Sequence, residues 1–279
     1  MYLPNIDQVN LTKNEKTIYN FILSKGESIY LYTEIDISKN TGVSQPTVSR
    51  FWRKIGFNNF KEFKENVKTL NISPTPSEKF KSTLSSDKFN YKNYLNHTIS
   101  LLESSVNKLD EDKFNKAVNY FINSRKIFTH GIGPSESLCE LLKFRLKRFG
   151  LNVSCLPSTG QNIYEELINT CENDLFVLFL FSHYHPETYV IIDFAKKNNI
   201  KLVLITDMII KPFEDENIIT LYISRGELFE FHSLTGPLFL IESLIVSIGI
   251  AREKLSLEKL KKLEELRDTY EEFIPRKLK

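Results

Sequence analysis

The sequence lacks the features that would place it outside the ordinary globular proteins. It contains no run of about 18 uncharged apolar residues, the length that a membrane-spanning helix requires. No apolar segment follows a basic start, so we expect no secretory signal and a cytoplasmic protein. Only three cysteines are present, Cys139, Cys155 and Cys171, and their spacing fits no metal site. We therefore predict buried free thiols in a reducing compartment, no bound metal and no membrane partner.

The chain also lacks an overall excess of charge. Lys and Arg total 37 and Asp and Glu total 35 in 279 residues, and a balance of +2 indicates no particular partner. The charge is unevenly distributed, because residues 1–70 hold ten basic and seven acidic side chains. Residues 44–68 alone hold six basic side chains and two acidic ones. This basic N-terminal segment favours a nucleic-acid partner.

Glycine and proline are scarce, with ten of each, so their clusters are informative. Pro74 and Pro76 stand two apart in a Ser-rich stretch, which cannot lie inside a helix and predicts a linker. The final segment carries a leucine stripe that either packs on its own domain or forms a dimer contact. We predict a helical domain over residues 1–72, a linker over 73–90, an α/β domain over 91–253 and a C-terminal helix over 254–279.

Strands and helices alternate after the linker, following one or two helices over residues 91–122. Strands separated by helices of this length predict right-handed crossovers and a three-layer α/β domain with a parallel five-stranded sheet. The expected strands are 126–130, 152–156, 175–181, 201–206 and 218–223, and the expected helices are 135–149, 161–171, 186–198 and 236–250.

A tight turn and a polar-faced helix predict DNA binding by the N-terminal domain. Gly42 lies at the turn, Ser44 can cap the following helix, and Pro46 falls in its first turn, where a missing N–H is harmless. One face of this helix is apolar, and the other offers groups that bond to base edges and phosphates. The pattern is that of a helix-turn-helix, with an ordinary three-helix domain as the alternative. The predicted DNA-binding residues are Ser44, Gln45, Thr47, Ser49, Arg50, Arg53 and Lys54.

A glycine loop follows the first strand of the α/β domain. Gly131 and Gly133 let the backbone approach a ligand, Ser135 adds a hydroxyl, and the helix N-terminus offers N–H groups to an anion. Open α/β sheets bind ligands at such strand ends. A dinucleotide would need a third glycine and an acidic residue after the next strand, and both are missing. We predict an anion site without a nucleotide cofactor, with a plain tight turn as the alternative.

Four segments of the N-terminal domain together resemble the helix-turn-helix of the MurR/RpiR transcriptional regulators. They read Leu11-Thr12-x-x-Glu15-Lys16-x-Ile18, Val43-Ser44-x-x-Thr47-Val48-x-Arg50-Phe51, Lys54-x-Gly56-Phe57 and Phe60-x-x-Phe63-Lys64. Members of that family carry a C-terminal sugar isomerase (SIS) domain. The resemblance implies a homodimer or homotetramer that binds operator DNA, regulates carbohydrate or amino-sugar metabolism and responds to a phosphorylated sugar.

The resemblance also implies where a sugar phosphate would bind. In SIS domains the loop after the first strand is part of the site, which implies Gly131, Gly133 and Ser135. The usual Ser-rich phosphate loop S-x-S-G-x-T is replaced here by Ser182-His183-Tyr184-His185-Pro186-Glu187-Thr188. This resembles a family variant, R-Y-S-x-E-T. It implies ligand contacts from Ser182, His183, Tyr184 and Thr188. An imidazolium at His183 would lose its charge near neutral pH, so an altered or lost ligand stays open.

The sequence favours regulation over catalysis. Sugar isomerisation needs a base of tuned pKa, and nothing fixes Glu136, Glu165 or Glu230 to a catalytic position. We therefore predict a regulator without catalytic residues or a cofactor. The alternatives are a DNA-binding regulator whose SIS domain only dimerises and an active aldose–ketose sugar-phosphate isomerase.

Overall fold

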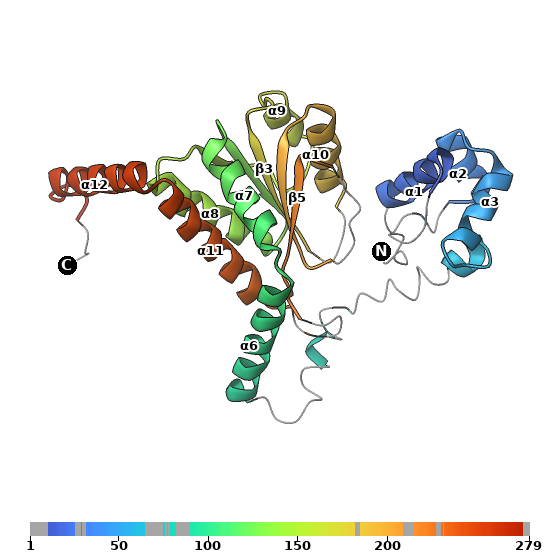
Figure 1. The fold of residues 1–279 in the computed structure, drawn as a ribbon, viewed down its shortest axis with the longest axis horizontal. Helices are drawn as coiled ribbons and strands as arrows, with labels where there is room; N and C mark the ends of the chain where they lie inside the picture. The colour runs from blue at the N-terminus through green and yellow to red at the C-terminus, as the bar shows by residue number, and fades with distance from the viewer. Residues whose placement is uncertain are drawn as a thin grey trace.

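The computed structural model describes residues 11–25, 29, 32–64, 75, 77, 79–81, 90–181, 185–208, 215–226, 230 and 232–275. Its first part is a helical domain (Figure 1), built from α1 (Lys13–Lys25), α2 (Glu34–Thr41) and α3 (Gln45–Lys54). The three helices enclose one apolar core, in which Trp52 stacks on Phe60 and Phe63. This core fixes α3 by its apolar face and leaves its polar face outside.

The turn between α2 and α3 has the predicted chemistry. Thr33 and Asp36 form a capping box at the start of α2. Gly42 ends α2 with a φ of 69°, in the left-handed region that glycine adopts without strain, and its N–H donates to the Ser38 carbonyl. Ser44 is the extended N-cap residue of α3, as predicted, but its side chain makes no capping hydrogen bond to the helix backbone. The predicted helix-turn-helix geometry is therefore confirmed.

The second part is a three-layer α/β domain around the predicted five-stranded parallel sheet. The strand order is β2-β1-β3-β4-β5, and β1 pairs with β3 from Ile127–Leu175 to Gly131–Phe179. The strands are β1 (Ile127–Gly131), β2 (Val153–Cys155), β3 (Leu175–Leu180), β4 (Lys201–Thr206) and β5 (Ile218–Tyr222). The helices are α6 (Tyr91–Lys108), α7 (Glu111–Asn123), α8 (Ser135–Arg148), α9 (Ile163–Leu167), α10 (Pro186–Lys197), α11 (Thr235–Ala251) and α12 (Glu253–Thr269).

Helices cover both faces of this sheet, as Figure 1 shows. The larger core joins α7, α8 and α11 to one face, through side chains such as Phe121, Leu142 and Leu244. The smaller core joins α9 and α10 to the other face, through Ile163 and Ile191. Every residue of β3 is buried, as expected for a central strand covered on both sides.

Two expected elements differ from the structure. The helix expected over 161–171 is only α9, because its buried side chains, Ile163 and Leu167, span one turn. The Thr170 hydroxyl then donates to the Leu167 carbonyl beyond the helix end. The helix expected over 254–279 is α12, which ends at Thr269, and its leucine stripe does not pack fully on its own domain, since Leu257 and Leu266 are exposed. No single helix within the described ranges is long and apolar enough to cross a membrane. Only α11 and α12 taken as a pair, bent by 100°, reach that length and composition.

Candidate DNA interface and ligand site

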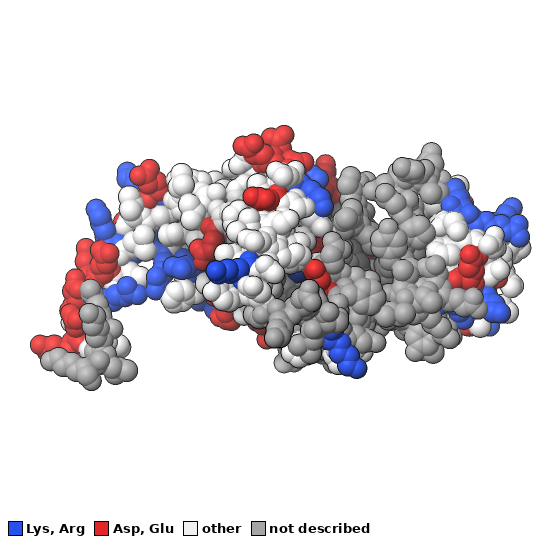
Figure 2. All heavy atoms as spheres, turned by 90° about the horizontal axis from the view of Figure 1, so that it is seen from below, with Lys and Arg blue, Asp and Glu red and all other residues white. Residues whose placement is uncertain are grey.

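The outer face of α3 presents most of the residues assigned to DNA. Arg50 and Arg53 are exposed and lie opposite the buried Val48 and Trp52 at 100° per residue. Figure 2 shows Lys and Arg side chains on the outer surface of the helical domain. Two cations on the exposed face of a second helix match the docking of a recognition helix in the major groove.

The N-terminal turn of α3 presents three more of the predicted residues. Ser44 and Gln45 are exposed, and Thr47 is half-buried with its hydroxyl 2.9 Å from that of Ser44. These groups stand where recognition helices contact base edges. Polar side chains therefore precede the two arginines along the same helix.

The other two predicted DNA-binding residues are engaged inside the domain. The Ser49 hydroxyl donates to Glu34 Oε2 at 2.8 Å, and Trp52 Nε1 donates to Glu34 Oε1 at 2.7 Å. Lys54 Nζ lies 2.7 Å from Glu15 Oε2, in an ion pair between α3 and α1. In this arrangement Ser49 and Lys54 fix the position of α3, and Arg50 and Arg53 remain directed outward.

The sheet topology brings those predicted ligand residues that the structure describes to one edge. The order β2-β1-β3-β4-β5 reverses direction between β1 and β3, and ligands bind beyond the carboxyl ends of strands at such a switch point. Gly131 ends β1, and Ser135 begins α8 and is buried. Thr188, in the first turn of α10, is also buried. Ser182, His183 and Tyr184 lie outside the described residues.

The loop between β1 and α8 is held tightly together. A Cβ on Gly131 would lie 2.7 Å from Ser135 Cβ, so only glycine permits this approach. Gly133 has a φ of 61° and open space around its Cα. Within the described part of the chain, the Ser135 hydroxyl makes no hydrogen bond that would occupy it. The loop therefore offers a hydroxyl and a glycine backbone beside a helix N-terminus.

A loop from β2 and the start of α10 border the same edge. Glu187, in the first turn of α10, accepts a hydrogen bond from the Gly160 N–H at 3.3 Å. The half-buried His185 is the extended N-cap residue of α10. Segments that follow β1, β2 and β3 therefore converge at the switch point.

His130 is the buried polar residue at this edge that the sequence reasoning missed. It immediately precedes Gly131 and has 1% of its surface exposed. Neither ring nitrogen has a hydrogen-bond partner in the described structure. Burial lowers the pKa of His130 to about 4, although the Pro157 carbonyl and the Glu187 carboxylate act in the opposite direction. Its signal in the sequence was one titratable side chain at the end of an apolar strand.

A second polar cluster, also missed, lies beyond β4 and β5. Arg225 Nε donates to Asp207 Oδ2 at 2.8 Å, and the guanidinium lies 4.4 Å from the ring centre of Phe181. Lys79, from the predicted linker, reaches His232 Nδ1 at 3.2 Å. Burial and the nearby Arg225 lower the pKa of Lys79. The linker segment thus contacts the α/β domain near the end of β3.

The cysteines were predicted to be buried free thiols: all three are free, but only Cys139 is buried, and Cys155 and Cys171 are half-buried. Burial raises the pKa of Cys139 to about 12, and burial also raises the pKa of Cys155. The Thr129 hydroxyl lies 3.3 Å from Cys155 Sγ. Among the described residues, His, Cys, Asp and Glu form no group of three that could hold a metal ion.

Matches to two known domain families define the class of this chain. A helix-turn-helix domain of the rpiR family matches residues 2–71, and a SIS domain matches residues 120–247. This is a transcription regulator with a DNA-binding and a SIS domain, and the chain belongs to the RpiR family.

Relatives and solved structures agree with that assignment. An HTH-type transcriptional regulator of Thermotoga maritima is 30% identical over 201 residues, covering 70% of each chain. Another, from Clostridium perfringens, is 25% identical and covers 85% of this chain and 87% of its own. The structure of Vibrio vulnificus NanR complexed with ManNAc-6P has a TM-score of 0.56 at 17% identity, over 95% of each chain, and shows the same fold.

Proposed function

We propose that the protein is a dimeric DNA-binding regulator of carbohydrate or amino-sugar metabolism whose DNA affinity responds to a phosphorylated sugar. The observation that carries this proposal is the glycine loop at the β1/β3 switch point, in a chain that also presents an outward-facing recognition helix. NanR, which shares the fold, is described in complex with the sugar phosphate ManNAc-6P. A ligand would act through its different affinities for two arrangements of the domains.

The proposal includes no catalytic turnover. The three carboxylates considered for an isomerase lie on separate elements: Glu136 on α8, Glu165 on α9, and Glu230 beyond β5. Glu230 also lies 3.0 Å from His97 of α6. An isomerase base must lie within hydrogen-bond reach of the substrate proton, and of these three carboxylates only Glu136 is among the groups that act on His130 at the candidate ligand edge of the described structure.

The DNA arm is tested on α3. We expect Arg50→Ala and Arg53→Ala each to weaken binding to DNA from upstream of the protein's own gene by about 1–3 kcal/mol if the side chain contacts a base. A phosphate contact would instead lower the salt dependence of binding by about one charge. Fluorescence anisotropy at several salt concentrations measures both. Lys113→Ala, at an exposed lysine on α7, is the control. Unchanged binding by both arginine variants would refute the interface.

The effector arm is tested by thermal shift on the full-length protein. Glucosamine 6-phosphate, N-acetylmannosamine 6-phosphate and ribose 5-phosphate are compared with inorganic phosphate. We expect at least one sugar phosphate to raise the Tm, because a ligand at 100 times its Kd stabilises the folded state by about 2.7 kcal/mol. Ser135→Ala should reduce this shift. If no sugar phosphate raises the Tm, the SIS domain serves only in dimerisation.

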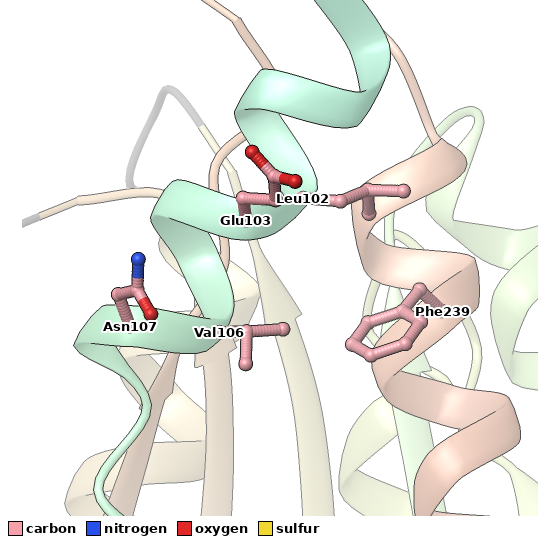
Figure 3. Close-up of a pocket in the computed structure, with 5 residues that line it drawn as sticks. All are labelled: Leu102, Glu103, Val106, Asn107 and Phe239. Carbon is pink, nitrogen blue, oxygen red and sulfur yellow. The ribbon is translucent and has the colours of Figure 1, made fainter.

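The dimer arm rests on an apolar surface over α6 and α11. Although α11 is apolar all round, only one side is buried, while Phe239, Val246 and Ile250 are exposed at intervals of seven and four residues. Figure 3 shows Phe239 opposite Leu102 and Val106 of α6, beside a hollow of about 430 Å³. Large exposed apolar patches mark interaction sites, and a second copy of the chain is the occupant we propose.

A further inference from the structure

The imidazole of His130 is buried at the candidate ligand edge, and its contacts in the described structure explain no role for it in the fold. Thr129 directs its hydroxyl toward Cys155, and His130, the next residue of β1, projects to the opposite face of the sheet. There His130 is 1% exposed, and in the described structure both ring nitrogens are unpaired. A buried polar group without a partner costs about 1–3 kcal/mol, so an apolar side chain would serve the fold better.

The groups around His130 belong to the loops of the candidate site. The Pro157 carbonyl follows β2, Glu136 lies in the first turn of α8, and His185 and Glu187 begin α10. His130 is therefore surrounded by the same segments that converge at the switch point. A side chain buried there and unpaired is a second indication of a ligand, independent of the glycine loop.

The protonation state decides which ligand group His130 can meet. At neutral pH the ring is uncharged, with one N–H donor and one acceptor nitrogen. Neither nitrogen meets hydrogen-bond geometry with a described group, yet the Pro157 carbonyl acts on the ring as an acceptor, so the N–H is assigned to that side. The remaining nitrogen needs a donor. A phosphate dianion has only acceptor oxygens and would meet the lone pair unfavourably, whereas a hydroxyl donates.

We propose that His130 is a specificity-determining residue, which accepts a hydrogen bond from a hydroxyl of the bound sugar phosphate, directly or through one water. This inference rests on the proposed effector function. It orients the ligand, because a hydroxyl of the polyhydroxy part must face the end of β1. A ligand without a hydroxyl at this position would bind about three- to tenfold more weakly.

The test compares full-length wild type with His130→Phe and His130→Gln. We expect His130→Phe to weaken the best-binding sugar phosphate of the three-compound panel about three- to tenfold, the loss of one hydrogen bond. His130→Gln, which keeps an acceptor, should retain most of the affinity. The response to inorganic phosphate should stay within about twofold in all three proteins, since phosphate does not need the imidazole. Calorimetry gives the affinities, and thermal unfolding gives the stability without ligand.

The possible results separate the two hypotheses. If His130→Phe without ligand is at least as stable as wild type, the result supports the presence of an unpaired polar group at position 130. A clear loss of stability would indicate that His130 has a packing role instead. If both variants bind the sugar phosphate as wild type does, the inference fails and the effector function stands. An equal loss of sugar phosphate and inorganic phosphate also overturns it. If His130→Phe does not fold, a tenfold loss in folded His130→Gln for both ligands likewise overturns the inference. Failure of every sugar phosphate to bind wild type overturns both hypotheses.

Discussion

At the scale of single residues, His130 also sets how stability depends on pH. Its pKa is about 4 in the folded protein, mainly through burial, against about 6.5 in an unfolded chain. As the pH falls through that window the unfolded state takes up a proton first, so the free energy of unfolding decreases. The stabilisation that comes from a neutral His130 is complete above about pH 6.5. The free energy of unfolding falls by about 2 kcal/mol between pH 7 and pH 5.

Urea denaturation at pH 7 and pH 5 measures this loss. The matched variant is His130→Gln, which does not titrate and should lose about 2 kcal/mol less than wild type over the same interval. Comparing the two proteins removes the contribution of the other histidines. An equal pH dependence in both proteins would show that the His130 pKa is not lowered by folding.

Single residues also show where sequence reasoning reaches its limit. Arg50 and Arg53 could be assigned to the outer face of α3 from helical periodicity alone. Ser49 could not be assigned to Glu34, because that contact depends on how α2 crosses α3. His130 was recognisable as an unusual residue in an apolar strand, but its burial and unpaired nitrogens follow from the neighbouring loops.

At the scale of elements, the join between β1 and α8 depends on two glycines for different reasons. We expect Gly131→Ala to destabilise the α/β domain by about 1–3 kcal/mol, because the new Cβ would lie 2.7 Å from Ser135 Cβ. It should also abolish the sugar-phosphate thermal shift, since the helix N-terminus must move. Gly133→Asn should cost less than about 1 kcal/mol, because Asn tolerates a positive φ and the space is open.

Urea denaturation and thermal shift of the two variants test this order. Equal stability of Gly131→Ala and wild type would mean that the loop is not held as described. A larger loss for Gly133→Asn than for Gly131→Ala would place the constraint on backbone conformation instead of close packing.

Element boundaries were predictable where one local signal dominated. β4 begins and ends at the expected residues, because the apolar run 202–205 is flanked by the polar residues Lys201 and Thr206. The region 161–171 was expected to be helical throughout, yet tertiary packing uses only Ile163 and Leu167. The exposed leucine stripe of α12 shows that apolar spacing predicts an apolar helix face but does not identify the segment or partner that packs on it.

At the scale of the whole molecule, alternating strands and helices predicted the layered fold and the parallel sheet. The strand order was not readable, because crossovers of similar length can place a strand on either side of its predecessor. The contact of Lys79 with His232 was equally hidden, since 153 positions separate them. The strand order and this long-range contact determine where the candidate ligand edge and the linker segment lie.

The assembly of two chains gives the prediction of largest scale. We expect the wild type to have about twice the 32.6 kDa chain mass by light scattering, because the proposed two-fold interface would bury the exposed side of α11. Val246→Glu places a charge in that face and should yield monomers. Asn119→Glu, at an exposed polar site on α7, adds the same charge and should stay dimeric.

DNA binding should follow the assembly state. Two linked recognition helices bind a two-fold operator with an avidity about 10²–10⁴ above that of one, so monomeric Val246→Glu should lose most operator affinity although α3 is unchanged. Its residual binding should match that of wild type on a single half-site. A monomeric wild type at micromolar concentration, or a dimeric Val246→Glu, would mean that the exposed side of α11 is not the dimer interface.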